Sequence, residues 1–382
     1  MSTMDEVKHV FIIPQKILTA INLWPESSNG FKKITFSCIL LFLIALELGQ
    51  VCYLIRNIND VTAIAATIST MSTTFQAICK SSVVFFNNKR LEKVIKITKK
   101  NFWNADRVGD EIKQTILFYR WVVGGNMVLV LISAFVFAIG FLSKPLREGE
   151  KELPLLSLYP FDSKQSPFYE GCYIFQVVGD MYFSIISTCG HDDLFLTLSL
   201  NCITQFMILK EEFTKVGKSK IYRLNLQNNR ETFKYQHMYT ECIEQHILLL
   251  RIYNEIEKIF SFSNFIQLLC SVAAICVSSF LIVLEGEAQI LHLSSYCLGH
   301  ILQLFLCCSA ASELTYHSQN LAHFEFNSSW YTNKDLATIL MASQKPKRIF
   351  AMGIVEINYA TFISVLKLSF SFYTLLSNIV AK

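Results

Sequence analysis

The stretch "SVLKLSFSFYTLLSNIVAK" (364–382) is apolar enough to be a membrane helix, yet polar residues recur along it at steps of three and four. These polar positions are Ser364, Lys367, Ser371, Thr374 and Asn378. Positions with this spacing lie on one face of an α-helix. The polar face either meets water at a central axis between assembled subunits or holds packing hydroxyls that bond back to helix carbonyls.

The composition of the whole chain is that of a polytopic membrane protein. Of its 382 residues, 52% are apolar and 17% are charged, whereas soluble domains have roughly 45–50% apolar and about 25% charged residues. The net charge of +4 is too small to indicate a nucleic-acid partner. The twelve cysteines show no paired CxxC spacing, so we expect neither a disulfide framework nor a zinc site.

Seven segments are apolar over the length of about 20 residues that a helix needs to cross roughly 30 Å of hydrocarbon. We predict spans near 34–55, 62–86, 119–142, 169–208, 263–284, 289–312 and 353–380. The fourth is too long for one crossing and is expected to continue as a cytosolic helix. The predicted fold is an all-α membrane protein with seven transmembrane helices in a single domain, residues 1–382.

The orientation follows from the lysine and arginine residues outside the spans. Most of them lie in the N-terminal segment and in the second-to-third, fourth-to-fifth and sixth-to-seventh connections. Because positively charged connections stay in the cytosol, we predict the N-terminus inside and the C-terminus outside. The single glycosylation sequon, at Asn327, then lies in the cytosol and is expected to be unmodified.

Two inside connections, 88–120 and 231–262, place apolar residues among charges at helical spacing, as at Leu91, Val94 and Ile95. We predict cytosolic helical extensions of the third to fifth spans, whose apolar faces pack on each other, on other subunits or on the membrane surface. The outer connection, residues 143–168, contains four of the seven prolines and is expected to be irregular and exposed.

Few residues suggest chemistry. His191, Asp192 and Asp193 are neighbours about 100° apart on a helix, so they cannot converge on one ion unaided, and a polar contact is favoured over a metal site. Asp180 and Lys367 are functional candidates because they are ionisable residues inside predicted spans. No GxSxG, HExxH or P-loop spacing occurs, so we expect no enzyme and no cofactor.

Seven spans are also typical of G-protein-coupled receptors. That class needs an external N-terminus, whereas the charge distribution here predicts an internal one. Its Asp-Arg-Tyr sequence after the third span and its Asn-Pro-x-x-Tyr sequence in the seventh are missing, and the seventh span contains no proline. A transporter is the remaining alternative from another class.

Several stretches, in order along nearly the whole chain, resemble the insect odorant receptor family. They are "LTAINLWPESS" (18–28), "LSLYPFDSKQSPFYEGCYIFQ" (156–176), "HDDLFLTLSLNCITQFMIL" (191–209) and the tail from "SSWYTNK" (328–334) to the end of the chain. The tail is the most specific part, with a tryptophan, a Lys-Arg segment, a glycine and a last helix rich in Ser and Phe.

The resemblance implies an odorant-gated, non-selective cation channel, tetrameric, with cytosolic helices joined into an anchor domain and a pore lined by the last helix. At 382 residues the chain is similar to the ligand-tuned subunits rather than to the longer co-receptor Orco. The implied setting is a heterotetramer with Orco in the plasma membrane of olfactory sensory neurons. A gustatory-type receptor channel is the alternative within the same broad fold.

The resemblance also implies site residues. In the pore it places Leu375 and Ile379 at an apolar gate, which can close by dewetting, and Asn378 at a polar ring, beside Ser371 and Thr374. It places a pocket for small volatile odorants among the outer halves of the second, third, fourth and sixth spans. Those halves carry Met71, Ser72, Phe75, Ser133, Phe137, Phe141, Tyr173, Val177, Met181, His292 and Tyr296. For any one of these, ordinary helix packing is the alternative role.

Overall fold

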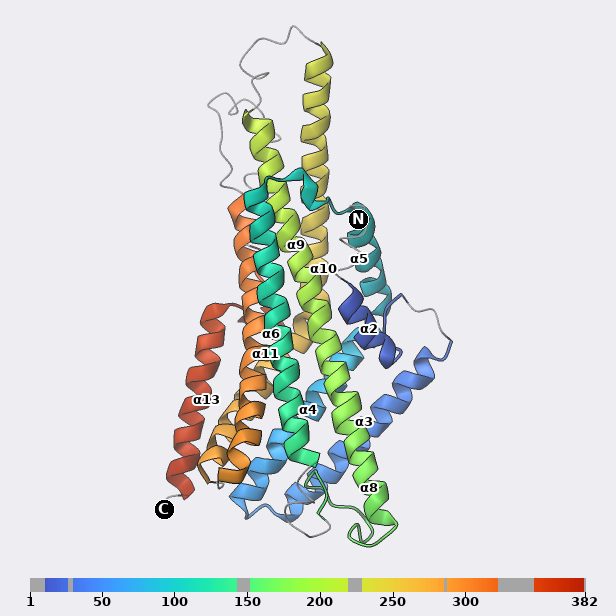
Figure 1. Ribbon diagram of the computed structural model, residues 1–382, viewed down its shortest axis with the longest axis vertical. Coiled ribbons are helices and arrows are strands. Elements are labelled where there is room, and N and C mark those ends of the chain that lie inside the picture. Colours follow the sequence, from blue (N-terminus) through green and yellow to red (C-terminus); the bar gives the residue numbers. More distant parts are fainter. Residues whose placement is uncertain are drawn as a thin grey trace.

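The computed structural model describes residues 11–26, 30–142, 152–218, 229–284, 287–321 and 347–380. Seven long helical segments form an elongated bundle (Figure 1), which confirms the predicted all-α fold. They are α3 (Lys32–Arg56), α4 (Val61–Phe86), α6 (Asp110–Leu142), the continuous run of α8 (Phe168–Gln176), η2 (Val177–Ser184) and α9 (Ile185–Lys218), α10 (Asn229–Leu284), α11 (Glu287–Asn320) and α13 (Tyr359–Val380). Shorter helices are α2 (Ile12–Ala20), α5 (Asn88–Asn101) and η1 (Ala105–Arg107).

Six of the described helical segments are long and apolar enough to cross a membrane, and α4 is not among them. The helix α4 is rich in Ser and Thr, and its polar side lies inside the bundle, where Thr67, Gln76 and Lys80 are buried. Hydroxyl groups such as that of Thr67, which donates to the Ala63 carbonyl at 2.7 Å, use carbonyls of the same helix. The second predicted span is therefore a helix with a polar interior face.

The helices α9 and α10 extend well past the rest of the bundle, at the top of Figure 1. With 56 residues at 1.5 Å each, α10 is about 84 Å long, more than twice the ~30 Å of a hydrocarbon layer. A side-chain bond from Gln245 Nε2 to Gln205 Oε1 (2.9 Å) links α10 to α9. The prediction that the fourth span continues as a longer helix is confirmed.

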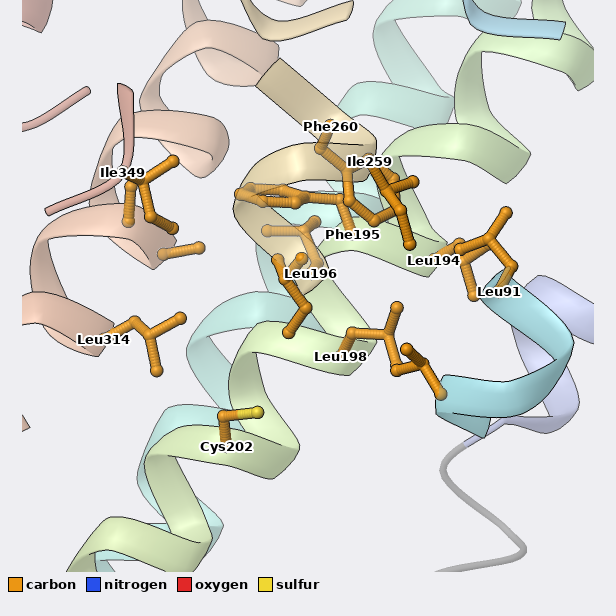
Figure 2. Packing of buried hydrophobic residues seen from close by; sticks show 14 of the residues in the cluster. Leu91, Leu194, Phe195, Leu196, Leu198, Cys202, Ile259, Phe260, Leu314 and Ile349 are labelled. Atoms are coloured by element: carbon orange, nitrogen blue, oxygen red, sulfur yellow. The ribbon is translucent and has the colours of Figure 1, made fainter. Parts of the chain in front are cut away.

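One large hydrophobic core joins most of the helices. Figure 2 shows a section where Leu194 and Phe195 of α9 meet Ile259 and Phe260 of α10, with Leu91 of α5 at the edge. The predicted amphipathic helix is α5, and its apolar face, including Leu91, is buried in this core. Most of its lysines are exposed, while Lys99 lies over the Phe11 and Trp24 rings. The face is thus covered by the same chain.

The last helix begins later than predicted. The span was expected near 353–380, whereas α13 starts at Tyr359. Before it, β1 (Phe350–Ala351) and β2 (Val355–Glu356) pair antiparallel around a reversal in which Met352 and Gly353 have positive φ, 51° and 69°. The Asn358 side chain accepts a hydrogen bond from the Thr361 amide at 2.8 Å and caps the helix, which fixes its start.

The outer connection is irregular, as predicted, but it is not uniformly exposed. Leu155 is only 1% exposed. Its amide donates to Gln176 Oε1 at 2.7 Å and its carbonyl accepts from Gln176 Nε2 at 3.2 Å, which ties the loop to the end of α8. Burial raises the pKa of Tyr159, whose hydroxyl also accepts from Gln176. The sequon at Asn327 lies outside the described residues.

Candidate functional site

A pocket lies between α4, α6, α11 and the segment formed by η2 and α9. Its empty space is about 620 Å³, a volume that includes the solvent at its open mouth. Its walls include three of the predicted ligand-binding residues, Ser133, Phe137 and Tyr296. Four helical segments that are distant in sequence therefore meet around one space.

Aromatic rings form one side of the pocket. Phe137 stacks on His292 at a centroid distance of 4.5 Å and lies 4.9 Å from the Tyr296 ring. Tyr296 in turn meets His300 edge to face at 4.6 Å. This wall offers the polarisable contact area that a volatile ligand needs.

The predicted hydroxyl donors already have acceptors inside the protein. Tyr296 donates to the Ser69 carbonyl and lies 3.3 Å from the Ser72 hydroxyl. Ser72 donates to the Ser69 carbonyl at 2.7 Å, and Ser133 donates to the Val130 carbonyl at 2.8 Å. The Tyr296 hydroxyl therefore ties α11 to α4, while Ser133 bonds within α6.

Other predicted residues lie behind the walls or away from them. His292 and Ser72 form a second layer through their contacts with Phe137 and Tyr296. The side chain of Phe141 lies outside the described residues. The predicted residues that belong neither to the pocket wall nor to this second layer are Met71, Phe75, Tyr173, Val177 and Met181. Phe75 is 46% exposed on the outside of α4.

The sequence reasoning missed the deeper half of the pocket. Gln76 and His300 line it and lie one helical turn beyond Ser72 and Tyr296. The faces of α4 and α11 that turn toward the pocket were therefore predicted closely, but the position of the pocket along these helices was not. Asp180 also lines it; its charge inside a span made it a functional candidate from sequence, although it was not assigned to the pocket.

A buried ion pair lies below the pocket. Lys80 of α4 is 1% exposed, and its Nζ lies 2.7 and 2.8 Å from the two carboxylate oxygens of Asp192 on α9. Lys80 also donates to Gln267 Oε1 of α10 at 2.6 Å, and Gln303 of α11 donates to Asp192 at 2.5 Å. We call Lys80, Asp192, Gln267 and Gln303 the polar cluster; it joins four helices.

His191 adds to this arrangement by contacting Asp192 at 3.0 Å and Ser263 of α10 at 2.9 Å. In the described part of the chain, no three His, Cys, Asp or Glu side chains gather as metal ligands would. The residues His191 and Asp192 make polar contacts between helices, which agrees with the interpretation favoured from sequence. A second, smaller pocket between Asp192, Gln267 and Gln303 shares Gln303 with the main one.

The last helix has one packed face and one exposed face. Val365 and Ser369 are buried, and Ser369 Oγ approaches the Val272 carbonyl of α10 at 3.4 Å. At about 100° per residue, the predicted polar face lies about 180° from these two residues. Ser371 and Asn378 on that face are exposed.

Of the three remaining predicted pore residues, the structure describes the side chains of Thr374 and Leu375. Thr374 is half-buried, and its hydroxyl donates to the Ser371 carbonyl at 2.7 Å. This bond to a carbonyl of the same helix is the alternative that the sequence left open for the polar face. Leu375 is 54% exposed. The side chain of Ile379 lies outside the described residues.

Comparisons with known proteins agree with this architecture. The family model described as "7tm Odorant receptor" matches residues 60–370. The chain is 22% identical to Odorant receptor Or1 of Anopheles gambiae, over 94% of this chain and 93% of that protein. It is 23% identical to Odorant receptor 10 of Aedes albopictus, over 80% and 81% of the two chains.

Solved structures show the same fold. The insect olfactory receptor OR5 from Machilis hrabei, in complex with eugenol, superposes with a TM-score of 0.82 at 15% identity, covering 99% of this chain and 100% of that one. The same receptor in a second structure also gives 0.82, at 16% identity. The matching family is one of receptors, and the described helices include several long and apolar enough to cross a membrane. The chain belongs to the odorant receptor family.

Proposed function

We propose that this chain is the ligand-tuned subunit of an odorant-gated, non-selective cation channel. It acts in a heterotetramer with the co-receptor Orco, as one unit from residue 1 to 382, in the plasma membrane of olfactory sensory neurons. The observation that carries the proposal is the pairing of a pocket that has an aromatic side with a last helix whose polar face is left largely uncovered by its own chain.

The pocket supports odorant binding. Its aromatic side, built on Phe137 and Tyr296, suits small volatile molecules, which bind mainly through dispersion and apolar burial. The two residues come from α6 and α11, so a ligand between them touches both helices at once. A ligand shifts a conformational equilibrium only if it contacts the two states differently, and a pocket between separate helices meets that condition when the helices move apart.

The last helix supports ion conduction. Its 22 residues span about 33 Å, enough to cross the hydrocarbon layer. The exposed face carries Ser371, Thr374 and Asn378, and polar groups of this kind are costly in lipid. Around a central axis, these groups would meet water, and the exposed Leu375 would supply the apolar constriction that closes the path.

The polar cluster supplies a physical connection between the two sites. Gln303 lines the pocket and bonds to both Asp192 and Gln267. Gln267 also donates to Ser271 at 3.0 Å, next to Val272, whose carbonyl meets Ser369 of the last helix. We propose that ligand binding moves α11, and with it α10 and α13, through this chain of contacts.

Whole-cell recording tests the proposal. Cells that express this chain with the co-receptor should give fast odour-evoked cation currents that persist when G-protein signalling is blocked. Cells that express this chain alone should give none. Loss of all current under the block would favour a receptor without its own pore.

A further inference from the structure

Most polar groups in the pocket wall already have partners. The hydroxyl groups of Ser133 and Ser295 donate to backbone carbonyls at 2.8 and 2.7 Å. Tyr296 donates to the Ser69 carbonyl. The Gln303 side chain donates to Asp192 and accepts from Gln267. The hydrogens of these hydroxyl groups are therefore already donated within the protein.

Four wall residues differ from these. One is Gln76 of α4, which is 1% exposed and whose Nε2 has no hydrogen-bond partner among the described residues. Asp180 of η2, Thr188 of α9 and His300 of α11 line the same pocket, with exposed fractions of 3%, 7% and 6%. Asp180 Oδ1, Thr188 Oγ1 and His300 Nδ1 have no hydrogen-bond partner among the described residues. Buried polar atoms are almost always paired, because an unpaired one costs free energy. Four such atoms around one pocket, counting Gln76 Nε2, point to a ligand that pairs with them.

Asp180 restricts the chemistry of that ligand. An ionised carboxylate only accepts hydrogen bonds, whereas a protonated carboxyl group can both donate and accept. A ligand group that both donates and accepts therefore pairs with either form of Asp180. The nearby buried cation, Lys80, is already held by Asp192 and Gln267. Ethers, esters, ketones and hydrocarbons have no O–H or N–H and leave the ionised form of Asp180 unpaired.

Thr188 and His300 restrict it further. A threonine hydroxyl, and an imidazole in one of its tautomers, present a hydrogen that needs an acceptor. A ligand hydroxyl both donates and accepts, so it can pair with Asp180 and with one of these two residues. A charged amine donates only and leaves the Thr188 and His300 hydrogens without an acceptor.

The position of Asp180 fits a ligand-binding role. It lies in η2, a π-helical stretch from Val177 to Ser184 inside an otherwise α-helical span. Such π turns in α-helices occur frequently at functional sites. The aromatic side of the pocket, Phe137 and Tyr296, then receives the hydrocarbon part of the ligand.

We propose that the pocket selects small volatile alcohols or phenols, and that Asp180, Thr188 and His300 are the residues that recognise the hydroxyl group. This rests on the proposed function, because it assigns the ligand class of the same site.

Matched ligand pairs test the assignment in cells that express the full chain with the co-receptor. Each pair contains a linear, branched or aromatic alcohol and an ether with the same number of heavy atoms, such as 1-hexanol and 1-methoxypentane. An alkane and a primary amine of the same length complete each set. In the unmodified receptor, the half-maximal concentration of the best alcohol should be about tenfold below that of its ether, the gain of one buried hydrogen bond.

Two variants locate the effect. Asp180→Leu keeps the branched shape without an acceptor, and Thr188→Val keeps the shape without the hydroxyl. Asp180→Leu should bring the alcohol and ether concentrations within about twofold of each other, and Thr188→Val should reduce the difference several-fold. Thr67→Val is the matched control, because Thr67 is equally buried but lies outside the pocket and donates to its own helix. Ether-evoked current in each variant shows that the channel has assembled.

The outcomes separate the two proposals. Ethers or alkanes as potent as the alcohols, amines as the preferred ligands, or an Asp180→Leu receptor that keeps its preference for alcohol would each overturn the hydroxyl assignment while leaving an odorant-gated channel. If no member of any set evokes current although both subunits reach the cell surface, the proposed function itself is contradicted.

Discussion

Lys80 shows how one residue in the bundle depends on its partners. Its ammonium group is buried inside a predicted membrane span, where an isolated charge is very costly. Asp192 neutralises the charge, and Gln267 satisfies a further donor. The ion pair therefore holds α4 and α9 together because neither charge is tolerated there alone.

Replacing Lys80 should be strongly destabilising. The Lys80→Met change leaves Asp192 without its counter-ion and should lower the free energy of unfolding by about 3–5 kcal/mol. The double change Lys80→Met with Asp192→Asn should recover part of the loss, because an amide needs no counter-ion. Thermal melting of the detergent-solubilised receptor, together with surface labelling in cells, measures both.

The control for this prediction is Lys96→Met. Lys96 pairs with Glu92 at 2.6 Å on the exposed side of α5, and an exposed pair of this kind contributes little. If the Lys80→Met receptor melts at the same temperature as the Lys96→Met receptor, the polar cluster is not the tie between helices described above.

At the scale of single elements, η2 and α3 approach each other closely at Gly179. A Cβ atom at this position would lie 2.1 Å from Leu46 Cδ1 and 3.0 Å from Phe42 Cε1. Leu46 is itself buried in the main core. The absence of a side chain at Gly179 is what allows the π-helical segment, and with it Asp180, to pack against α3.

Gly179→Ala should therefore force the two helices apart and destabilise the fold by about 1–3 kcal/mol, the range for overpacking. Gly171→Ala is the matched control, since a Cβ at Gly171 of α8 meets nothing within 4 Å, and there alanine should leave stability unchanged or slightly raised. Leu46→Ala combined with Gly179→Ala should restore part of the loss. Equal melting temperatures for the two single variants would contradict the close approach.

At the scale of the whole molecule, the bundle buries one face of α13 and leaves the rest to its surroundings. The packed face rests on α10 and α11, beside the main body of the bundle (Figure 1). Ser371, Asn378 and Lys367 lie on the exposed side. Lipid is a poor environment for these groups, so the isolated chain is incomplete and an assembly that turns them toward water is favoured.

Cysteine accessibility tests that arrangement in the assembled channel. After replacement of the exposed Cys38 and Cys52 by alanine, cysteines at Ser371 and Asn378 should react with charged thiol reagents while odorant is present. A cysteine at Ser369, which is 1% exposed and packed on α10, should stay unreactive. Reaction at Ser369 with protection of Asn378 would place the wet surface on the other face of the helix.

The sequence alone predicted much of the element structure. Apolar length and helical spacing are local properties, so the seven helical segments, the long fourth segment and the polar face on the last helix were predictable. The predicted start of the last span, near residue 353, was wrong, because a short strand pair and the Asn358 cap precede the helix, which begins at Tyr359. The burial of Leu155 was not predicted, because its backbone is held by hydrogen bonds to Gln176, a residue in the next helix.

The tertiary structure decided which residues share a site. Local pattern fixes the face of a helix that turns inward, but not its vertical offset against its neighbours, and that offset brings Asp180, Thr188 and His300 together while leaving Phe75 outside. Asp192 and Lys80 are 112 positions apart, and no local spacing relates them. The amino-acid sequence therefore determined that the chain forms membrane-crossing helices, and only their packing decided which side chains form the pocket.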